Sequence, residues 1–262
     1  MDVQKTKNAV LLSGLLLSGC AAKTPVHSDS ETIQAHSILE QADRNDLRLE
    51  SYRMSNRETF ESEGGMEKTE FAVRVQFTRD CLYMISDFPE GSYRLARYEL
   101  KNGRKHSIDG ANLNVRSGTW AFLDETGKLQ DCFQVENEMQ VEDYISIPEA
   151  YLYSKNTYEI LGTSQDSTEI RIENLVSQGK KPEGLQQDIR LTVGSDGYLQ
   201  NLSATEAGPN QQYVYRKNRD FSDFNISLMN TEALDEFLNK AASKELKTGD
   251  SVSISDFEIS ES

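Results

Sequence analysis

One cysteine near the N-terminus, Cys20, stands in a sequence context in which its thiol can be alkylated. It ends the segment Leu17-Ser18-Gly19-Cys20, which looks like a bacterial lipobox. In such a box the thiol receives a diacylglyceryl group, the preceding peptide bond is cut, and the cysteine becomes the mature N-terminus. Small residues at positions 18 and 19 give a peptidase access to that bond. The segment therefore predicts lipid attachment at Cys20 and a cleaved lipoprotein signal peptide, residues 1–19.

The residues before Cys20 fit a signal peptide better than a membrane-spanning helix. Lys5 and Lys7 precede the short apolar run Ala9–Leu17. Crossing about 30 Å of hydrocarbon takes about 20 apolar residues, so this run is too short to span a membrane. Two alternatives stay open, an ordinary secretory signal with an unmodified Cys20 and a short buried apolar segment. If acylated, the chain is held firmly, because each buried CH₂ adds about 0.8 kcal/mol.

Two further cysteines, Cys81 and Cys132, lie in segments that alternate like strands. An exported location permits a disulfide between them. Closing that loop would add about 4 kcal/mol on the chain-entropy argument. We expect the disulfide, because an exposed thiol outside the cell is a liability. The alternative is two separate buried thiols that act as small apolar side chains.

Other residue types with chemical potential form no recognisable site. The three histidines are His27, His36 and His106, and we expect all three to be solvated. No Gly-x-Ser-x-Gly segment, calcium loop or glycine-rich phosphate loop is present in the sequence. The sequence therefore predicts no catalytic residue, no metal site and no cofactor.

Three tyrosines, Tyr151, Tyr153 and Tyr158, cluster near Pro148. Such a cluster packs in a core or at a sheet edge more often than it lines a ligand entrance. We expect packing, with the ligand entrance as the alternative.

Charge and composition narrow the class of protein. The 262 residues include 43 Asp and Glu but only 28 Lys and Arg, which gives a net charge of −15. A nucleic-acid binder needs clustered basic residues against phosphate, so the acid excess argues against one. Eleven Tyr and ten Phe argue against a disordered chain, which lacks aromatic residues.

The segment after the signal peptide predicts a tether and then a helix. Residues 20–30 are small and polar, which is typical of a flexible linker. A helix begins near Ser28 or Ser30, since Ala35, Ile38, Leu39 and Ala42 recur at the spacing of one helical face. We expect a single domain over residues 31–247.

From residue 47 onward the apolar period changes to two, which predicts strands with one buried face. Turn signals separate them, among them Asn102-Gly103, Asp109-Gly110, Gly127 and Asp196-Gly197. Many strands joined by tight turns predict an antiparallel sheet. The expected strands are Phe71–Phe77, Cys81–Ile85, Tyr93–Leu100, His106–Ile108, Asn112–Val115, Thr119–Leu123, Leu129–Val135, Thr157–Thr163, Thr168–Leu175, Asp188–Val193, Tyr198–Ala204 and Tyr213–Arg216.

The C-terminal part predicts one more helix and a tail. Thr231 is the expected cap of a helix over Glu232–Lys247, with Leu234 and Phe237 on its apolar face. Residues 248–262 are acidic and contain no basic residue, so we expect a frayed tail. The alternative is a short edge strand, because apolar residues recur there.

The order of these elements resembles the LolA-like superfamily of bacterial lipoproteins. The resemblance is carried by Ile38–Tyr52, by the hairpin Ile189–Leu202 and by the aromatic-rich segment Phe221–Leu228. It implies an α+β fold, a strongly curved antiparallel β half-barrel wrapped over one or two α-helices. It also implies an apolar cavity that takes acyl chains of a lipid or lipoprotein, and it brings no catalytic residues.

Together these observations favour a lipid-anchored, extracytoplasmic and non-enzymatic binding protein of the bacterial cell envelope. Its membrane contact would be the N-terminal lipid, and its ligand hydrophobic or acylated. Because the chain keeps its own anchor, tethered binding is favoured over shuttling between membranes. The main alternative is an envelope module that binds another protein, with a filled core and an acidic surface that selects the partner. A hydrolase is the third and least favoured hypothesis.

Overall fold

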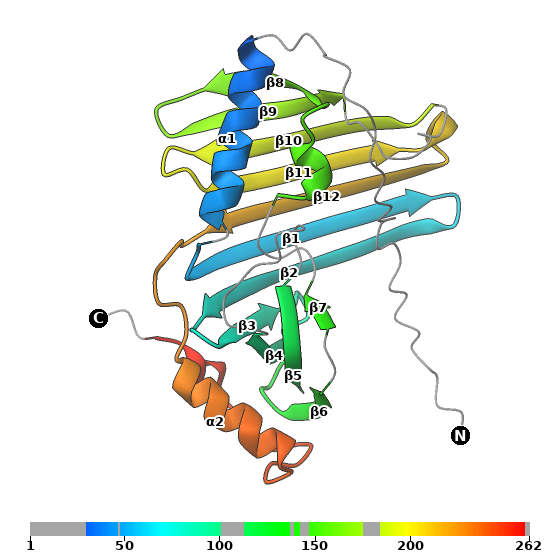
Figure 1. Cartoon of the computed structure of the whole chain (residues 1–262). Helices are drawn as coiled ribbons and strands as arrows, with labels where there is room; N and C mark the ends of the chain where they lie inside the picture. Colours follow the sequence, from blue (N-terminus) through cyan, green and yellow to red (C-terminus); the bar gives the residue numbers. More distant parts are fainter. Residues whose placement is uncertain are drawn as a thin grey trace.

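The structure is a computed structural model that describes residues 30–46, 48–100, 113–136, 139–141, 147–174 and 184–259. It consists of a large antiparallel sheet with two helices, α1 and α2 (Figure 1). The elements are α1 (Ser30–Asp46), β1 (Ser51–Ser62), β2 (Gly65–Phe77), β3 (Cys81–Asp87), β4 (Tyr93–Leu100), β5 (Leu113–Leu123), β6 (Leu129–Val135), β7 (Met139–Val141), η1 (Glu149–Leu152), β8 (Thr157–Thr163), β9 (Ser167–Asn174), β10 (Gln186–Gly194), β11 (Leu199–Ala207), η2 (Pro209–Gln211), β12 (Tyr213–Ser222), α2 (Thr231–Ala242) and η3 (Ile254–Phe257).

The sheet is open. Its strand order is β6-β5-β4-β3-β2-β1-β12-β11-β10-β9-β8, and β7 pairs with the first residues of β5 beside β6. The two end strands of this order, β6 and β8, do not pair with each other among the described residues, so the sheet does not close into a barrel. Within the sheet, the pairing of β1 with β12 joins strands β1–β6 to strands β8–β12 (Figure 1). Strands β3–β6 run at an angle to β1 and to β8–β12, because neighbouring strands of a sheet are twisted relative to one another.

The two helices cover opposite faces of this sheet. On β3, Leu82 and Met84 belong to one apolar cluster, whereas Tyr83 and Ile85 belong to the cluster that contains α2. Since successive strand residues point to opposite faces, α2 lies on the face of Tyr83 and Ile85. Phe221 of β12 packs against both the Leu82 cluster and the cluster that contains α1, so α1 lies on the other face.

These three clusters are named by what they contain. The helix-1 cluster joins α1 to β8–β11, and the helix-2 cluster joins α2 to β3–β6. The central cluster lies on the same face as α1, over β1–β5, and includes no residue of either helix among the described residues. The sequence predicts a sheet wrapped over one or two helices. A sheet cannot wrap over two helices that lie on its opposite faces, so at most one helix can be enclosed.

The first helix forms as its spacing predicts. Ala35, Leu39 and Ala42 are fully buried against the helix-1 cluster, and Ile38 is partly buried there. The helix contacts β8 most extensively (Figure 1). Thr32 contributes a polar contact, because its hydroxyl donates to the carbonyl oxygen of Tyr158 at 3.2 Å. The apolar spacing is therefore confirmed as the docking face of α1.

The second helix differs from the prediction at both ends. Its N-cap is Asn230, whose side chain accepts from the amide of Ala233 at 3.1 Å, so the predicted cap, Thr231, is the first helical residue. It ends at Ala242 instead of Lys247, since Lys244 adopts a φ of 64°, a conformation that ends helices. The predicted apolar face, which includes Leu234 and Phe237, is buried as expected.

The C-terminal segment is packed against the sheet up to residue 259, so the predicted frayed tail is wrong. Phe257 is 2% exposed, and its ring contacts that of Phe237 in a tilted arrangement with 5.4 Å between the centroids. Ser251 bridges to Lys128, and the amide of Val252 donates to the carbonyl oxygen of Gly127 at 2.8 Å. Only glycine fits at 127, because φ is 76° and a Cβ would collide with the carbonyl oxygen of Val252. Val252, Ile254 and Phe257 cover the edge of the helix-2 cluster instead of forming a strand.

Each predicted strand among the described residues overlaps an observed strand, but β1 and β7 were not among the predicted strands and β12 runs on to Ser222. The predicted strands Asn112–Val115 and Thr119–Leu123 merge, since residues 113–123 form one strand, β5, which pairs with β4 from Val115 onward with a bulge near Leu100. The turns at Gly127 and Gly197 have the positive φ values, 76° and 81°, that their sequences predict. The segment 106–108 and the turns at 102–103 and 109–110 lie outside the described residues.

A buried carboxyl group lies where α1 meets the β10–β11 hairpin. Asp46, the last residue of the helix, is 3% exposed and accepts from the amide of Leu199 at 3.3 Å. Burial raises the pKa of Asp46 well above its usual value, and nearby Asp43 and Asp196 add to that rise. A negative charge at a helix C-terminus is also opposed by the helix dipole. The ionised form of Asp46 therefore costs stability at neutral pH.

We expect Asp46→Asn to stabilise the fold at pH 7. The amide keeps an acceptor for Leu199 and removes the buried charge, which is worth about 1–3 kcal/mol. Because the folded-state pKa of Asp46 is raised, its contribution to stability is present at acid pH and is lost as pH rises. The advantage of the variant should therefore vanish below about pH 4, where the aspartate of the unfolded chain is also protonated.

Urea unfolding of both proteins between pH 4 and pH 8 measures this difference. Asp188→Asn, in an exposed ion pair with Arg190, is the matched control and should change stability little at any pH. A loss of stability at pH 7 in Asp46→Asn would show that the carboxylate is required.

Candidate functional site

The face of the sheet that carries α1 is apolar along most of its length. In the central cluster, Tyr52 and Met54 of β1 lie opposite Val75 and Val73 of β2. Met84 of β3 continues the row beyond Val75. Residues directly opposite each other share a face, so these side chains form one continuous surface. Methionines are flexible and adapt to irregular apolar shapes, which suits a surface that binds a hydrophobic group.

A polar centre interrupts this apolar face where β1 meets β12. Asn56 lies opposite Arg219, and Glu58 lies opposite Lys217. The next neighbour of Arg219 across the sheet is Leu202 of the helix-1 cluster, which puts the polar centre on the α1 face. Asn56 is 2% exposed and Arg219 is 9% exposed. The polar centre therefore lies between the central cluster and the helix-1 cluster.

Its contacts join charged and polar side chains. The Nε of Arg219 donates to Oδ1 of Asn56 at 3.1 Å. Oε1 of Glu58 lies 3.6 Å from the ammonium of Lys217 and 3.9 Å from the Arg219 guanidinium. Burial raises the pKa of Tyr215, and the Glu58 carboxylate raises it further, so that phenol stays protonated at neutral pH. The Glu58 carboxylate therefore interacts with two cations, Lys217 and Arg219, and with the Tyr215 hydroxyl.

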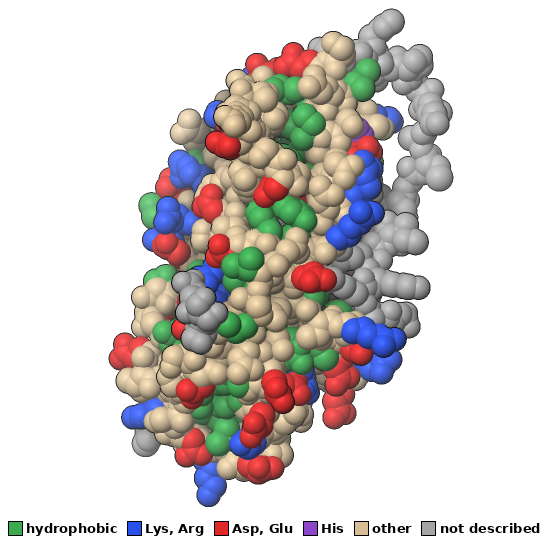
Figure 2. Space-filling model, turned by 90° about the vertical axis from the view of Figure 1, so that its left-hand side faces the viewer, with side chains coloured by type: hydrophobic (Ala, Val, Ile, Leu, Met, Phe, Trp, Pro, Cys, Tyr) green, Lys and Arg blue, Asp and Glu red, His purple; other side chains and the backbone are tan. Residues whose placement is uncertain are grey.

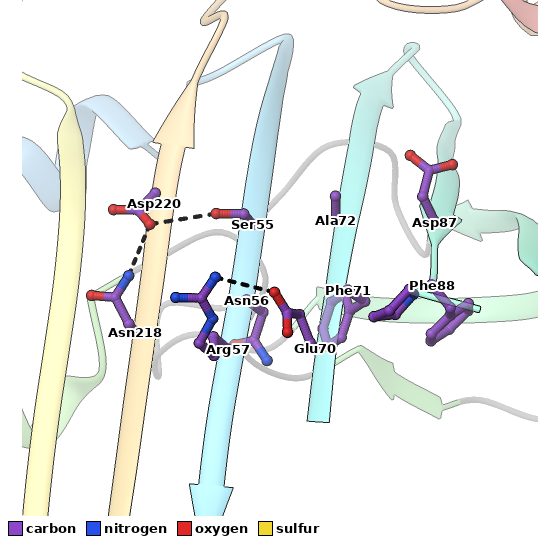
Figure 3. A pocket seen from close by; sticks show the side chains of 11 residues that line it. Ser55, Asn56, Arg57, Glu70, Phe71, Ala72, Asp87, Phe88, Asn218 and Asp220 are labelled. Atoms are coloured by element: carbon purple, nitrogen blue, oxygen red, sulfur yellow. Dashed lines mark hydrogen bonds and ion pairs between the residues drawn. The ribbon is translucent and has the colours of Figure 1, made fainter. Parts of the chain in front are cut away.

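The opposite face is polar over β12, β1 and β2 and carries a groove. Its floor is made of the small side chains Ser55 and Ala72, and Asp220 and Asp87 stand at its two ends (Figure 3). Two adjoining hollows of about 310 and 400 Å³ share these four residues. The groove exists because the row between flanking arginine and glutamate side chains holds only small groups.

The charges around this groove are paired. Asp220 accepts from Asn218 at 2.8 Å and from Ser55 at 3.4 Å, and Arg57 donates to Glu70 at 3.1 Å (Figure 3). A buried guanidinium, that of Arg74, contacts Asp87 and also Glu258 of the C-terminal segment, at 3.3 and 2.5 Å. Burial raises the pKa of Asp87, and Arg74 opposes that rise. The lining residues include no histidine, cysteine or lysine, so this groove suits polar recognition better than nucleophilic chemistry.

The sheet order separates the two cysteines of the predicted disulfide. Cys81 lies on β3 and Cys132 on β6, with β4 and β5 between them. Three strand spacings amount to about 14 Å. A disulfide needs Cα atoms within about 7 Å. Both residues are free thiols in the structure and pack at the margin of the helix-2 cluster, which corresponds to the alternative of two separate thiols.

The other residues considered from sequence have modest roles or lie outside the described residues. Cys20 and His106 are outside them. His36 is packed instead of solvated, because its Nε2 lies 2.8 Å from the carbonyl oxygen of Leu152 and its ring contacts Tyr158. Tyr158 is 3% exposed, and its hydroxyl donates to the carbonyl oxygens of Tyr151 and Tyr153. Tyr158 therefore packs in the core as expected, Tyr151 packs against the helix-1 cluster partly buried, and Tyr153 is partly exposed.

Sequence reasoning missed the polar centre. The alternation of side chains along β1 could have revealed it. Asn56 and Glu58 occupy the same alternate positions as Tyr52 and Met54, so they lie on the same face of the sheet. A polar residue at a position that should be apolar indicates a polar group in the core. Arg219 and Lys217 lay beyond the predicted end of their strand, and their parity was therefore not considered.

Similar solved structures include three that cover most of this chain. A DUF1329 family protein from Desulfovibrio piger has a TM-score of 0.27 and 8% identity, over 76% of this chain and 94% of that one. A putative outer membrane lipoprotein-sorting protein domain from Vibrio parahaemolyticus has a TM-score of 0.28 and 11% identity, over 79% and 99%. A LolA superfamily protein from Nitrosomonas europaea has a TM-score of 0.23 and 10% identity, over 76% and 96%.

One of these structural neighbours is a protein of the LolA superfamily, the family that the sequence resembles. No family model and no curated protein matches the chain. At such identities and TM-scores the neighbours carry no residue roles to this chain. Its function is therefore argued from its own side chains.

Two further findings concern the described residues only. None of their helices is both long and apolar enough to cross a membrane. No group of three or more His, Cys, Asp or Glu side chains among them is arranged to hold a metal ion. Figure 2 shows one side of the molecule, on which acidic and basic side chains are interspersed and apolar side chains form small separate patches.

We expect Cys81 and Cys132 to react as two separate thiols. Burial raises the pKa of both, so they should react slowly with iodoacetamide in the folded protein and rapidly in denaturant. Intact-mass measurement of the denatured, unreduced chain should show two alkylations, and Cys81→Ser or Cys132→Ser should each remove one. If alkylation occurs only after addition of a reductant, the two cysteines form a disulfide.

Proposed function

We propose that this protein is a lipid-anchored binding protein of the bacterial cell envelope that faces away from the cytoplasm. After removal of residues 1–19, the acylated Cys20 would hold it at a membrane, with the first residues of the mature chain as a tether. The sheet would act as a half-barrel whose apolar face receives a hydrophobic or acylated ligand. No catalytic step is part of this function.

The observation that carries this proposal is the central cluster. Its side chains form an apolar layer across five strands, on the α1 face, and neither helix contributes to it among the described residues, although each side chain is at most 8% exposed. By contrast, the helix-1 and helix-2 clusters are each closed by an amphipathic helix. An apolar layer of this extent suits an acyl chain that inserts among its side chains, since burial of each CH₂ contributes about 0.8 kcal/mol.

A second function is favoured by the opposite face. The groove with Ser55 and Ala72 on its floor offers paired acidic and basic groups to a polar partner, and its margins are exposed. Interspersed charges of this kind select partners and set association rates. In this alternative the protein is an envelope module that recognises another protein through the groove.

Lipid anchoring has a direct test in Cys20. We expect Cys20→Ala to abolish incorporation of radiolabelled palmitate, because no other side chain in the segment can form the thioether. Cys81→Ala and Cys132→Ala serve as matched controls and should label like the unsubstituted protein. If Cys20→Ala incorporates as much palmitate as the unsubstituted protein, Cys20 is not the site of lipid attachment.

Ligand binding has a test in two alanines on neighbouring strands. Ala96 and Ala121 are both fully buried, but Ala96 belongs to the central cluster and Ala121 to the helix-2 cluster. We expect Ala96→Leu to lower oleate binding by about tenfold or more, because extra methylenes occupy the space of the ligand chain.

Ala121→Leu is the control for this experiment. Overpacking should destabilise both variants by about 1–3 kcal/mol, measured by urea unfolding. Only Ala96→Leu should lose oleate, measured by titration of the protein at equal folded concentration. If both variants bind oleate like the unsubstituted protein, or if that protein binds none, the protein-recognition alternative is favoured.

A further inference from the structure

One carboxylate in the groove of the polar face, that of Asp220, makes no ion pair among the described residues. The other acidic side chains that line the two adjoining hollows each pair with an arginine, namely Glu70 with Arg57, and Asp87 and Glu258 with Arg74. Asp220 accepts hydrogen bonds from neutral groups only. The groove therefore keeps one uncompensated negative charge at the β12 end.

Three neutral donors hold this carboxylate in a fixed position. Nδ2 of Asn201 donates to its Oδ1 at 2.6 Å. Asn218 and Ser55 both donate to its Oδ2, at 2.8 and 3.4 Å (Figure 3). A carboxylate has about four acceptor positions, so one position is left, on Oδ1. The fork of an arginine side chain uses both oxygens, whereas a lysine ammonium needs one. Asp220 is therefore better suited to lysine.

Space for a long side chain lies beside Asp220. Ser55 is directly opposite Asp220 on β1, Ala72 is directly opposite Ser55 on β2, and both are exposed. The hollow over this row measures about 400 Å³, within the range of about 300–1,000 Å³ that ligand sites occupy. The arginines on either side of Ser55, Arg53 and Arg57, are each paired with a carboxylate, so their repulsion of an ammonium is reduced.

The same hollow is also lined by a side chain with an unused donor. Arg74 is 8% exposed, and its terminal nitrogens contact Asp87 and Glu258, but its Nε is buried without a hydrogen-bond partner. Such a group costs about 1–3 kcal/mol. Of the four side-chain nitrogens in this state among the described residues, only the one of Arg74 belongs to a residue that lines this hollow. A ligand that carries both a cation and an acceptor oxygen matches the hollow.

We propose that the groove binds a lysine-bearing segment of a partner protein, with the lysine ammonium on Asp220 and a main-chain carbonyl oxygen beside Arg74. A polypeptide supplies both groups at each lysine, whereas a polyamine supplies cations alone. The net charge of −15 favours the approach of a basic partner. This assignment specifies the partner in the protein-recognition alternative and does not depend on acyl-chain binding.

The test titrates the full mature chain, held in amphipol, with the capped peptide acetyl-Ala-Lys-Ala-amide. We expect the peptide to shift the side-chain amide NMR signals of Asn201 and Asn218, because both amides contact Asp220. The same peptide with norleucine in place of lysine keeps the aliphatic stem but has no ammonium, so it should shift neither signal. An arginine peptide and spermidine should each bind at least threefold more weakly than the lysine peptide.

A charge variant tests the carboxylate. Asp220→Asn should lower the affinity for the lysine peptide by about fivefold, the effect of losing one exposed ion pair. Added salt should weaken binding to the unsubstituted protein more than to the variant, because salt screens the ion pair. Asp188→Asn is the matched control, since Asp188 is also exposed but lines neither hollow. It should leave the affinity unchanged.

A second variant tests the groove without changing its charge. Ala72→Gln should weaken binding at least fivefold, because the longer side chain fills the floor on which the lysine stem lies. Thr205→Gln is its matched control, since Thr205 lies opposite Arg216 on the polar face and lines neither hollow. It should bind the peptide like the unsubstituted protein.

The outcomes separate this inference from acyl-chain binding, which the oleate titration decides by itself. If the lysine peptide shifts neither amide signal at millimolar concentration, the assignment is overturned. If the norleucine peptide binds equally well, or Asp220→Asn binds the lysine peptide equally well, the contact with Asp220 is overturned. If spermidine binds as tightly as the lysine peptide, the groove is a cation site and the peptide assignment is overturned. Tighter binding of the arginine peptide would overturn the choice of lysine.

Discussion

Side chains of a β-strand point alternately to the two faces of its sheet, and strands β3, β4 and β5 use both faces to bury apolar groups. Leu82 and Met84 face the central cluster, whereas Tyr83 and Ile85 face α2. Each of these strands therefore needs a covering layer on both faces of the sheet. This constraint explains why α2 packs on one face of these strands and why the C-terminal segment is needed to complete the helix-2 cluster, through Phe257.

The other half of the sheet needs only one apolar layer. Strands β9–β12 bury alternate residues on the α1 face and present polar and charged groups on the other. Arg190, for example, lies on the opposite face from Leu191 and pairs with Asp188 and Glu169. The groove over β12, β1 and β2 belongs to this polar face, and Arg74 ties it to the C-terminal segment through Glu258. In this half of the sheet the two faces are therefore chemically distinct, one apolar and one polar.

Within the apolar face, the polar centre is a local departure from the pattern. A charged pair in a core seldom adds stability by itself, because removing both groups from water costs about as much as their attraction returns. Arg219 and Glu58 are placed at the border of two apolar clusters, where a well-packed pair of apolar residues would also fold. The Nδ2 group of Asn56, which is buried without a hydrogen-bond partner, adds a further cost.

Much of the local structure follows from the sequence alone. Ala35, Leu39 and Ala42 specify the docking face of α1 by their spacing, and Gly127 and Gly197 specify turns by their need for positive φ. These features depend on residues close together in the chain, so local physical rules are sufficient. Only the tertiary structure decided the separation of Cys81 from Cys132, the packing of residues 248–259 and the meeting of Asn56 with Arg219. Each of these depends on which strands become neighbours in the sheet. That order is set by contacts between residues far apart in the sequence, and Asn56 and Arg219, for example, are more than a hundred positions apart.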